Sequence, residues 1–513
     1  MSPLSRRDLF RAGIVGVGAI GASQASAAST RPAVPPADPR LQSFHYDHTV
    51  GTSLDGWVFG DGEKAGLAAL SEIDRLNLVF SPHDPSSELG RFNHDGLAPT
   101  SQDFYTVHKL FESWSRVTGG VLSPRMAPIQ HMWQDAAAAN RLPTQAEITA
   151  TLATVRESRA RGKLTLNSVA KGYILHRAGE AAKSVSPQGG MVDLGGDLVT
   201  WGDRPFTVGI ANPSSPFDNA SPLTAIAVQN LAVATSGGYL RGYDIAGRHY
   251  SHILDPRTGL PADAVAQATV IAPDATTANA LATACCVLDP RESIRIIESL
   301  AGVECLIVPA EGPAIRSSGF ANFEVALEAT NDTDVANETE TETETTLVTD
   351  WLKDYQVTVS LEIVKFMGGG RYRRPYVAVW VENSDDKIVR TLAVWGRQPR
   401  WLPELTGWWK LAKSDQELVK SVTKATRSPG KYDVVWDGKN DKGKALPQGK
   451  YTIKVEVNRE HGKHLYQSGK INCEGDDDTI TLEKNAEMGD VIVTYGKKTD
   501  KKPEDKKTES QKP

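Results

Sequence analysis

The sequence predicts an α+β domain followed by an all-β sandwich domain. Residues 44–328 combine strand-like alternation with segments whose apolar residues recur at helical spacing. Residues 351–495 carry short strand patterns separated by turn signals, which is typical of a β-sandwich. Between them, residues 329–350 are dominated by Asn, Asp, Thr and Glu, and this composition predicts a solvated linker.

The size, charge and cysteine content of the chain limit the class of protein. A chain of 513 residues is too long for one hydrophobic core, so two or three domains are expected. A formal net charge of -6 gives no electrostatic reason to expect nucleic acid as a partner. The four cysteines have no CxxC spacing, so neither a zinc site nor a disulfide framework is predicted.

The N-terminal segment is interpreted as an export signal. Arg6 and Arg7 precede a short apolar run, and Ala25-Ser26-Ala27 fits a cleavage site, so residues 1–27 are interpreted as a twin-arginine signal peptide. The apolar run is too short to span a bilayer well. We therefore expect no transmembrane segment in the mature chain, and a periplasmic or secreted location. A Pro-rich leader at 28–43 follows the signal, and a disordered charged tail at 496–513 ends the chain.

The first half of the α+β domain combines hairpin, turn and helix patterns. Residues 45–60 alternate around Gly51 and predict a hairpin. The apolar residues from Leu67 to Leu76 predict a helix that ends before Phe80. The expected elements that follow are a polar turn at 86–93, a helix started by Thr100-x-x-Asp103, a glycine-rich turn at 118–125 and a helix started by the capping box Thr144-x-x-Glu147.

Lys171 stands at a predicted strand-to-helix junction. Leu164 to Leu166 predict a strand, Asn167 and Ser168 predict the helix cap, and the helix runs to about Lys183. Free N–H groups at a helix start, with a lysine beside them, suit a phosphate. A plain connection with an exposed lysine explains the same residues, so this segment alone leaves both interpretations open.

The stretch from Ala234 to Pro261 concentrates polar residues between glycines and prolines, as expected of a binding site on turned backbone. An ordinary hairpin explains this stretch equally well, with a strand at 250–254 and a turn at 255–259. A further strand is expected at 265–271.

The next predicted helix is expected to be capped by Thr276 to Asn279 and to run through Leu288. Asn279 and Thr283 lie four residues apart on it, on one face. Their two oxygens could share a cation, although both side chains could instead bond only to the backbone.

The C-terminal domain is expected to consist of strands. The strand patterns lie at 357–363, 376–381, 389–395, 432–436 and 451–457. Seven of the 11 tryptophans fall in this domain, and we interpret them as packing residues because nothing else in the sequence suggests base stacking.

Taken together, the motifs resemble the ApbE family of FAD:protein FMN transferases. The matching segments are Gly51-Thr52, 86–93, Ala170-Lys171-Gly172-Tyr173, Asp193 to Asp197, Ala234 to Gly237, His252 to Gly259 and Ala280 to Thr283. The resemblance covers residues 44–328 and implies a mixed sheet with flanking helices. Residues 355–495 look like an Ig-like periplasmic domain of unknown function that is often fused behind such enzymes.

The resemblance implies a function. The protein would bind FAD as a substrate and transfer its FMN half to a Thr or Ser of an exported acceptor flavoprotein, with release of AMP. Phosphoryl transfer of this kind needs charge neutralisation at the pyrophosphate and a base for the attacking hydroxyl.

The resemblance also implies roles for individual residues. His252 would be the base, and Lys171 would neutralise phosphate charge. The Ala170 carbonyl and Thr283, with Asn279, would form a Mg²⁺ site. The remaining residues implied to contact FAD are Val50, His83, Ser123, Thr165, Gly195, Gly196, Ser236 and Thr258.

The chain departs from the family pattern at several of these positions. The family usually has Asp at the positions of Asn279, Thr165 and His176, Tyr at the position of His83 and Met at the position of Val50. Asn279 has the largest consequence, because an amide oxygen brings no charge to a magnesium site. Two alternative functions therefore stay open: an FAD pyrophosphatase that uses the same site, and a flavin-binding module that has lost turnover.

Overall fold

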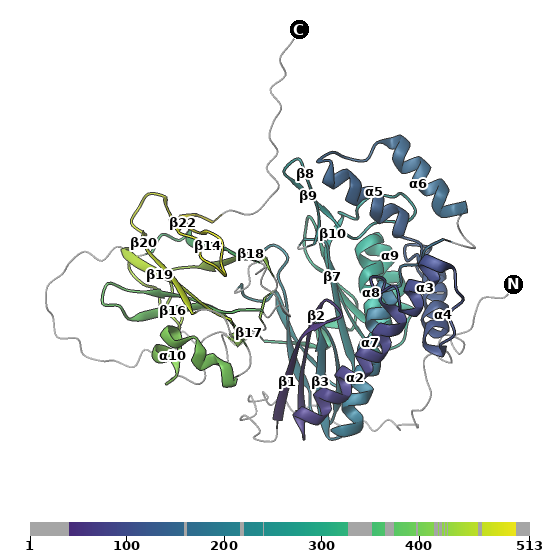
Figure 1. Ribbon diagram of the computed structural model, residues 1–513, viewed down its shortest axis with the longest axis horizontal. Coiled ribbons are helices and arrows are strands. Elements are labelled where there is room, and N and C mark those ends of the chain that lie inside the picture. The colour runs from purple at the N-terminus through teal and green to yellow at the C-terminus, as the bar shows by residue number, and fades with distance from the viewer. Residues whose placement is uncertain are drawn as a thin grey trace, which may run out of the picture. The chain divides into compact units, whose positions relative to one another are not determined.

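The computed structural model describes most of the two predicted domains (Figure 1). The described residues are 41–157, 162–215, 220–239, 241–326, 351–364, 374–396, 399–414, 419, 423–424, 426–427, 429–459 and 464–498. The chain divides into two compact units, one of residues 1–208 and 227–324 and the other of residues 209–226 and 325–513. The predicted signal peptide at 1–27, the linker at 329–350 and most of the leader and tail lie outside the described residues. Within the described part of the chain, no helix has the length and apolarity needed to cross a membrane.

An eight-stranded sheet forms the centre of the first unit, and its strand order is β1-β2-β3-β4-β7-β10-β11-β12. The strands are β1 Leu41–Thr49, β2 Thr52–Phe59, β3 Gly189–Leu194, β4 Asp197–Gly202, β7 Ala232–Gly237, β10 Val265–Ala272, β11 Glu304–Pro309 and β12 Ile315–Arg316. The predicted α+β class is confirmed. The sheet is not mixed as expected, however, because every neighbouring pair in it is antiparallel.

Tight turns explain part of this antiparallel pairing. The turn between β1 and β2 contains Val50 and Gly51, and the turn between β3 and β4 contains Gly195 and Gly196. All four residues have positive φ, which a two-residue hairpin turn requires at its centre. A connection of two residues returns the chain directly alongside itself, so the joined strands must be antiparallel.

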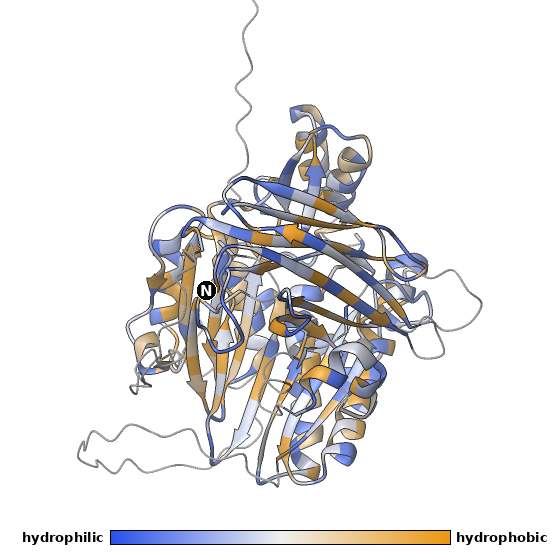
Figure 2. Ribbon diagram, turned by 90° about the vertical axis from the view of Figure 1, so that its left-hand side faces the viewer, coloured by the Kyte–Doolittle hydropathy of each residue, from blue (hydrophilic) through white to orange (hydrophobic). Residues whose placement is uncertain are grey.

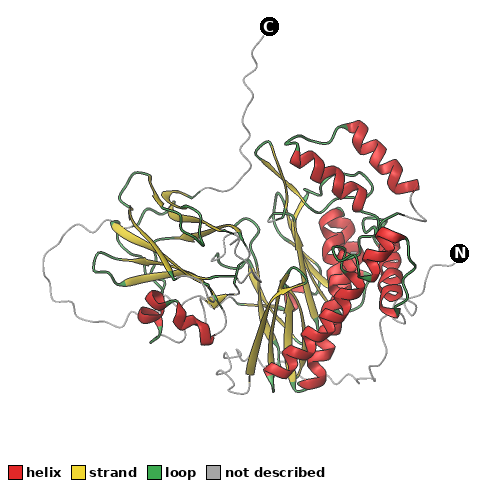
Figure 3. Cartoon of the chain, viewed as in Figure 1, coloured by secondary structure: helices red, strands yellow, loops and turns green. Residues whose placement is uncertain are grey.

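Helices cover one face of this sheet, as Figure 3 shows. They are α2 Gly62–Phe80, α3 Glu88–Asp95, α4 Gln102–Val117, α5 Ala127–Ala138, α6 Gln145–Glu157, α7 Asn167–Val185, α8 Ala275–Val287 and α9 Pro290–Glu298. Helix α2 packs on β1 and β2, α7 on β3 and β4, and α8 on β7 and β10. The apolar residues of the sheet and of these helices form one buried core.

Side-chain caps set several helix starts, and they correct the expected boundaries. The capping box is confirmed, because Thr144 and Glu147 bond reciprocally to each other's backbone N–H. Helix α4 is capped by Ser101 rather than Thr100. The expected polar turn at 86–93 largely forms helix α3, because the Ser87 hydroxyl caps it by accepting from the N–H of Gly90.

The predicted strand and helix cap before Lys171 were both wrong. Leu164 to Leu166 form no strand, because the side chain of Asn93 bonds to both the N–H and the carbonyl of Leu164. Helix α7 begins at Asn167 after Leu166, and no side chain caps it. The predicted cap of α8 at 276–279 was also wrong, since Asp274 accepts from the N–H of Thr277.

The second unit is a β-sandwich, as predicted. One sheet has the order β18-β14-β22-β21 and the other β17-β16-β15-β19-β20. The strands are β14 Tyr355–Ile363, β15 Tyr376–Glu382, β16 Ile388–Trp395, β17 Thr423–Lys424, β18 Gly430–Trp436, β19 Lys450–Asn458, β20 Leu465–Asn472, β21 Asp478–Leu482 and β22 Val491–Lys497. Buried residues of both sheets form one core, and hydrophobic and hydrophilic residues alternate along several strands (Figure 2). A short helix, α10 Thr406–Ala412, packs at the sandwich surface over Trp380.

Two small sheets complete the described structure. Strands β8 Gly242–Ile245 and β9 Arg248–Ser251 pair as a hairpin. Strands β5 Phe206–Ile210, β6 Thr224–Val228 and β13 Glu324–Val325 form a three-stranded sheet in the order β13-β6-β5. The strand expected at 250–254 therefore ends early, because β9 stops at Ser251 and only Leu254 forms a further bridge, with Pro261.

Candidate functional site

Lys171 contacts a buried carboxylate that belongs to the central sheet. Its Nζ lies 2.8 Å from Oδ2 of Asp197 and 3.4 Å from the carbonyl oxygen of Gly195. The Asp197 side chain is only 3% exposed, whereas that of Lys171 is 34% exposed. Lys171 therefore balances a buried charge and still presents its ammonium group to solvent at the uncapped start of α7.

Helix α8 brings Asn279 to the same carboxylate. Nδ2 of Asn279 donates to Oδ2 of Asp197 over 3.2 Å, and Oδ1 of Asn279 is buried and has no hydrogen-bond partner. Thr283 lies one turn further along α8, and its Oγ1 lies 3.3 Å from Oγ of Ser236. Lys171, Gly195, Asn279, Thr283 and Ser236 thus form one cluster, in which Asp197 contacts both Lys171 and Asn279.

The turn between β1 and β2 borders this cluster. The backbone N–H of Gly195 donates to the carbonyl of Ser53, and Gly195 lies so close to Thr52 that an added Cβ would come within 2.3 Å of its Oγ1. Val50 precedes this contact by two residues and is 37% exposed. Val50 and the Gly195-Gly196 turn therefore lie at one end of the sheet, next to Lys171.

Helices α7 and α8 approach most closely at Gly172, the residue after Lys171. A Cβ on Gly172 would lie 2.4 Å from the carbonyl oxygen of Ala275 and 2.8 Å from Cβ of Asn279. This contact fixes the position of Asn279 relative to Ala170 and Lys171 on α7.

Gly172→Ala is expected to lower the free energy of unfolding by about 1–3 kcal/mol, because the methyl group forces the two helices apart. Alanine normally stabilises a helix relative to glycine, so a loss of stability here reports the helix contact itself. Denaturant unfolding measures the change. Gly179→Ala is the comparison on α7, since its Cβ would meet the side chain of Val199 rather than the backbone of another helix. Equal or greater stability of Gly172→Ala than of the wild type would contradict the close packing.

Asp193 is a second carboxylate at this end of the sheet. The pKa of Asp193 is raised to about 6, chiefly by burial. The charges of Asp197 and of Asp55, its register partner on β2, also raise it, while a hydrogen bond from the N–H of Gly196 and the charge of Lys171 oppose the shift. Asp193 is therefore ionised at neutral pH at a cost in the free energy of folding, because the folded protein disfavours its charged form relative to the unfolded chain.

Asp193→Asn is expected to stabilise the fold by roughly 1–3 kcal/mol at pH 7 to 8, where the wild-type group is ionised. The pKa of Asp193 is raised on folding, so its favourable contribution is complete below the unfolded pKa near 4 and is lost as the pH rises through about 6. The advantage of the variant should thus disappear toward pH 4. Thermal unfolding from pH 4 to 8 tests this, with the exposed Asp135→Asn as control. Parallel stability curves for wild type and Asp193→Asn would show the prediction to be wrong.

His252 lies on the loop that follows the β8–β9 hairpin. Its Nδ1 lies 2.9 Å from the carbonyl oxygen of Arg241, so Nδ1 carries a proton and Nε2 is the acceptor of the neutral ring. Desolvation by the surrounding protein holds the pKa of His252 below its usual value, and the nearby charges of Arg241 and His249 lower it further, although the bond to the Arg241 carbonyl opposes them. A neutral imidazole with Nε2 as acceptor can take a proton.

A tight turn holds the rest of this loop, as predicted for 255–259. The carbonyl of Asp255 accepts from the N–H groups of Thr258 and Gly259, and its carboxylate pairs with Arg257 at 2.8 Å. The indole of Trp133 donates to the carbonyl of Gly259 over 2.8 Å. Thr258 itself is exposed.

The loop of His252 lies beside strand β7, which carries Ser236. Gly238 follows β7, and a Cβ on Gly238 would lie 2.2 Å from Oγ of Ser251, the residue before His252. Ser236 was expected on turned backbone, but it lies on a regular strand, paired with Ala268 of β10. Strand β7 therefore carries Ser236 next to Thr283, and the His252 loop contacts the chain two residues further on, at Gly238.

Three further predicted residues occupy other loops. Thr165 joins the loop of Ser123, because its N–H donates to the carbonyl of Pro124 and its Oγ1 accepts from the N–H of Met126. The hydroxyl of Ser123 accepts from the N–H of Arg125 in the same loop. His83 is exposed in the loop between α2 and α3. These contacts bring Ser123 and Thr165 together and leave His83 on a separate loop.

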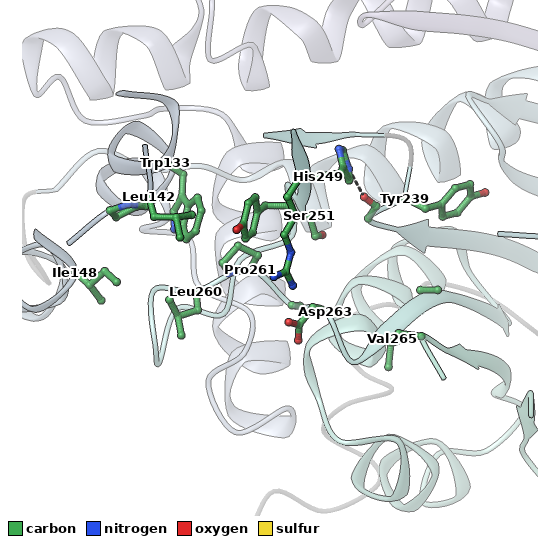
Figure 4. Close-up of a pocket in the computed structure, with 17 residues that line it drawn as sticks. Trp133, Leu142, Ile148, Tyr239, His249, Ser251, Leu260, Pro261, Asp263 and Val265 are labelled. Atoms are coloured by element: carbon green, nitrogen blue, oxygen red, sulfur yellow. Dashed lines mark hydrogen bonds between the residues drawn. The ribbon is translucent and has the colours of Figure 1, made fainter. Parts of the chain in front are cut away.

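A cavity of about 470 Å³ lies beside strand β9 and the end of the loop that follows it (Figure 4). Trp133 and Ile148 line it from α5 and α6, Tyr250 and Ser251 from β9, and Leu260 from the loop after the turn. The described residues that line it include none of the predicted site residues, so sequence reasoning missed it. Its lining comes from six separate segments of the chain, so no single local pattern predicts it.

Asp197 is the residue of this cluster that the sequence analysis missed. It belongs to the quoted segment from Asp193 to Asp197, but no role was assigned to it. Only the pairing of β4 with β7 and the packing of α7 and α8 bring its carboxylate to Lys171 and Asn279. Among the described residues, no three His, Cys, Asp or Glu side chains come together in the manner of a metal cluster.

Comparison with known proteins gives two family matches. A family model described as ApbE family matches residues 44–307, and a model described as a predicted periplasmic protein (DUF2271) matches residues 356–490. The chain is similar to the FAD:protein FMN transferase of Haemophilus influenzae, with 26% identity over 306 residues, which cover 53% of this chain and 88% of that protein. The FAD:protein FMN transferase of Treponema pallidum is 26% identical over 320 residues and is covered to 88%. The crystal structure of the ApbE protein of Thermotoga maritima aligns over its whole length and 56% of this chain, with 29% identity and a TM-score of 0.50.

Proposed function

This chain belongs to the ApbE family, and on that premise we propose that it is an FAD:protein FMN transferase that moves FMN from FAD to the hydroxyl of a Thr or Ser in an exported acceptor protein. The observation that carries the proposal is His252, a ring with Nε2 as proton acceptor on a loop whose Ser251 contacts Gly238 at the end of β7, the strand that carries Ser236. A base next to a cationic, hydroxyl-rich cluster is what transfer of a phosphoryl group to a hydroxyl requires.

The reaction balances with these residues. The acceptor hydroxyl oxygen attacks the phosphorus of the FMN half, and Nε2 of His252 takes the hydroxyl proton. The new bond is a phosphoester between the acceptor oxygen and FMN. The bond that breaks joins this phosphorus to the bridging oxygen of the pyrophosphate, and AMP leaves with that oxygen. Lys171 offsets the phosphate charge from the start of α7, where no side chain caps the first N–H groups.

We further propose that the site uses Mg²⁺. The residues fit such an ion, because Oδ1 of Asn279 is a buried oxygen without a partner and Thr283 presents a hydroxyl one turn away. Ala170 is buried two residues before Gly172, the α7 residue that contacts α8, and its carbonyl is the third oxygen in the proposal. When bound, the ion would neutralise charge on the pyrophosphate.

The location and the flavin contacts complete the proposal. We propose export by the twin-arginine route. The C-terminal match to a predicted periplasmic protein supports a periplasmic location. Val50, His83, Ser123, Thr165, Gly195, Gly196 and Thr258 stay proposed FAD contacts. Thr165 is hydrogen-bonded to Pro124 and Met126 in the loop of Ser123, and Val50 and Gly195 lie at one end of the sheet, so these two pairs are the better supported.

Incubation of the purified protein with FAD, Mg²⁺ and an exported flavoprotein domain tests the function. A covalent gain of one FMN by the acceptor supports transfer. Release of AMP and free FMN, with an unchanged acceptor, supports an FAD pyrophosphatase instead. FAD that stays bound and intact would show a binding module without turnover.

A further inference from the structure

We propose that Asp197 supplies the negative charge of the cation site that Asn279 lacks. The inference rests on the proposed function, and it gives a role in cation binding to a residue that is not among the predicted site residues. Position 279 contributes a neutral amide, whereas a divalent cation at a pyrophosphate is normally held by at least one carboxylate. Asp197 is the carboxylate that contacts both Lys171 and Asn279.

The hydrogen bonds of Asp197 place its charge at the contact of three elements. Oδ1 accepts from the N–H of Thr235 on β7 over 3.2 Å, and this bond fixes the carboxylate to the sheet. Oδ2 faces Lys171 of α7 and Nδ2 of Asn279 of α8. The carboxylate is thus held from behind by the backbone, and its other oxygen faces the site.

Asn279 is oriented by this contact. Because its Nδ2 donates to Asp197, its Oδ1 is directed away from that bond, and it is buried without a hydrogen-bond partner. A buried amide oxygen that lacks a partner costs roughly 1–3 kcal/mol, so its retention calls for an occupant that it can bind. A cation would bind that oxygen and would be neutralised by the charge of Asp197.

Lys171 explains how Asp197 stays neutralised when no cation is bound. In the described structure the ammonium group of Lys171 pairs with Asp197 at 2.8 Å. A pyrophosphate that attracts Lys171 weakens this ion pair. The carboxylate of Asp197, which is only 3% exposed, then lacks its counter-charge. A divalent cation that arrives with the pyrophosphate restores the balance, so cation binding and FAD binding should be coupled.

Binding of Mn²⁺, a paramagnetic substitute for Mg²⁺, tests this assignment independently of catalysis. The loss of the free-Mn²⁺ electron paramagnetic resonance signal is measured for each variant with and without FAD, and FAD alone is the blank. Asp197→Asn should weaken Mn²⁺ binding in the presence of FAD by about 10- to 100-fold. Asn279→Asp should strengthen it. The double variant Asp197→Asn/Asn279→Asp returns the charge to the other position and should bind Mn²⁺ nearly as the wild type does.

The double variant also separates charge from folding, because Asp197→Asn alone could weaken binding through local damage. Asp193→Asn is the matched control, since it removes a neighbouring carboxylate and should leave Mn²⁺ affinity unchanged. Unchanged affinity in Asp197→Asn, or no recovery in the double variant, would overturn the assignment. Transfer assays are read separately: wild-type protein that binds Mn²⁺ through Asp197 but never flavinylates an acceptor refutes the proposed function and leaves the assignment standing.

Discussion

His252→Gln is expected to lower the rate of FMN transfer by about 10²–10⁴-fold, the usual contribution of a general base. Glutamine keeps the size and one hydrogen bond of the ring, but it cannot take the proton of the acceptor hydroxyl. The loop should survive the change, because its turn is held by Asp255, Arg257 and Trp133. The measurement is the initial rate of flavin incorporation into the acceptor, with His131→Gln, an exposed histidine of α5, as the control.

The pH dependence of wild-type transfer gives the same test a second readout. Desolvation holds the pKa of His252 below its usual value near 6.5, so the ring is neutral and active throughout the neutral range. The rate should therefore rise with pH below about 6.5 and stay level from pH 7 to 8. A rate that still rises through pH 7 to 8, or a His252→Gln variant with wild-type activity, would remove His252 from the role of base.

Lys171→Ala is expected to lower kcat/KM for FAD by about 10²–10³-fold, because it removes the cation that faces the pyrophosphate. The same change leaves the buried charge of Asp197 without its partner, so the fold should also lose about 1–3 kcal/mol. Transfer kinetics and denaturant unfolding measure the two effects. Loss of the Lys171 ammonium group should therefore lower both the transfer rate and the stability of the fold.

The double variant Lys171→Ala/Asp197→Asn separates these two effects. Removing both charges should restore most of the lost stability, since no buried charge is left unpaired, while transfer stays impaired. Lys171→Arg keeps the charge and should lie between wild type and Lys171→Ala. A double variant that regains transfer would mean that Lys171 acts only by neutralising Asp197.

Local sequence signals predicted much of the fold. The capping box of Thr144 and Glu147 is confirmed, as are the hairpin around Gly51 and the turn from Asp255 to Gly259, because each depends on residues close together in sequence. The two-domain arrangement followed from a composition change alone. The domain boundaries at 44–328 and 351–495 stay predictions.

Features that depend on distant residues were harder to predict. Apart from the two tight hairpins, the antiparallel pairing of the sheet follows from long connections whose course no local pattern encodes. Leu164 to Leu166 had the composition of a strand, but the side chain of Asn93, 71 residues earlier, takes its hydrogen bonds. Asp197 was missed for the same reason, since its importance comes from Lys171 and Asn279, which approach it only in the folded chain.

The most direct test of the proposed function is the fate of the two halves of FAD in one reaction. The protein is incubated with FAD, Mg²⁺ and the acceptor domain, AMP is quantified, and the acceptor is digested and sequenced by mass spectrometry. We predict FMN in phosphoester linkage to one Thr or Ser of the acceptor, with AMP released in equal amount. AMP and free FMN in equal amounts, with an unmodified acceptor, would contradict the proposal that this site transfers FMN to protein.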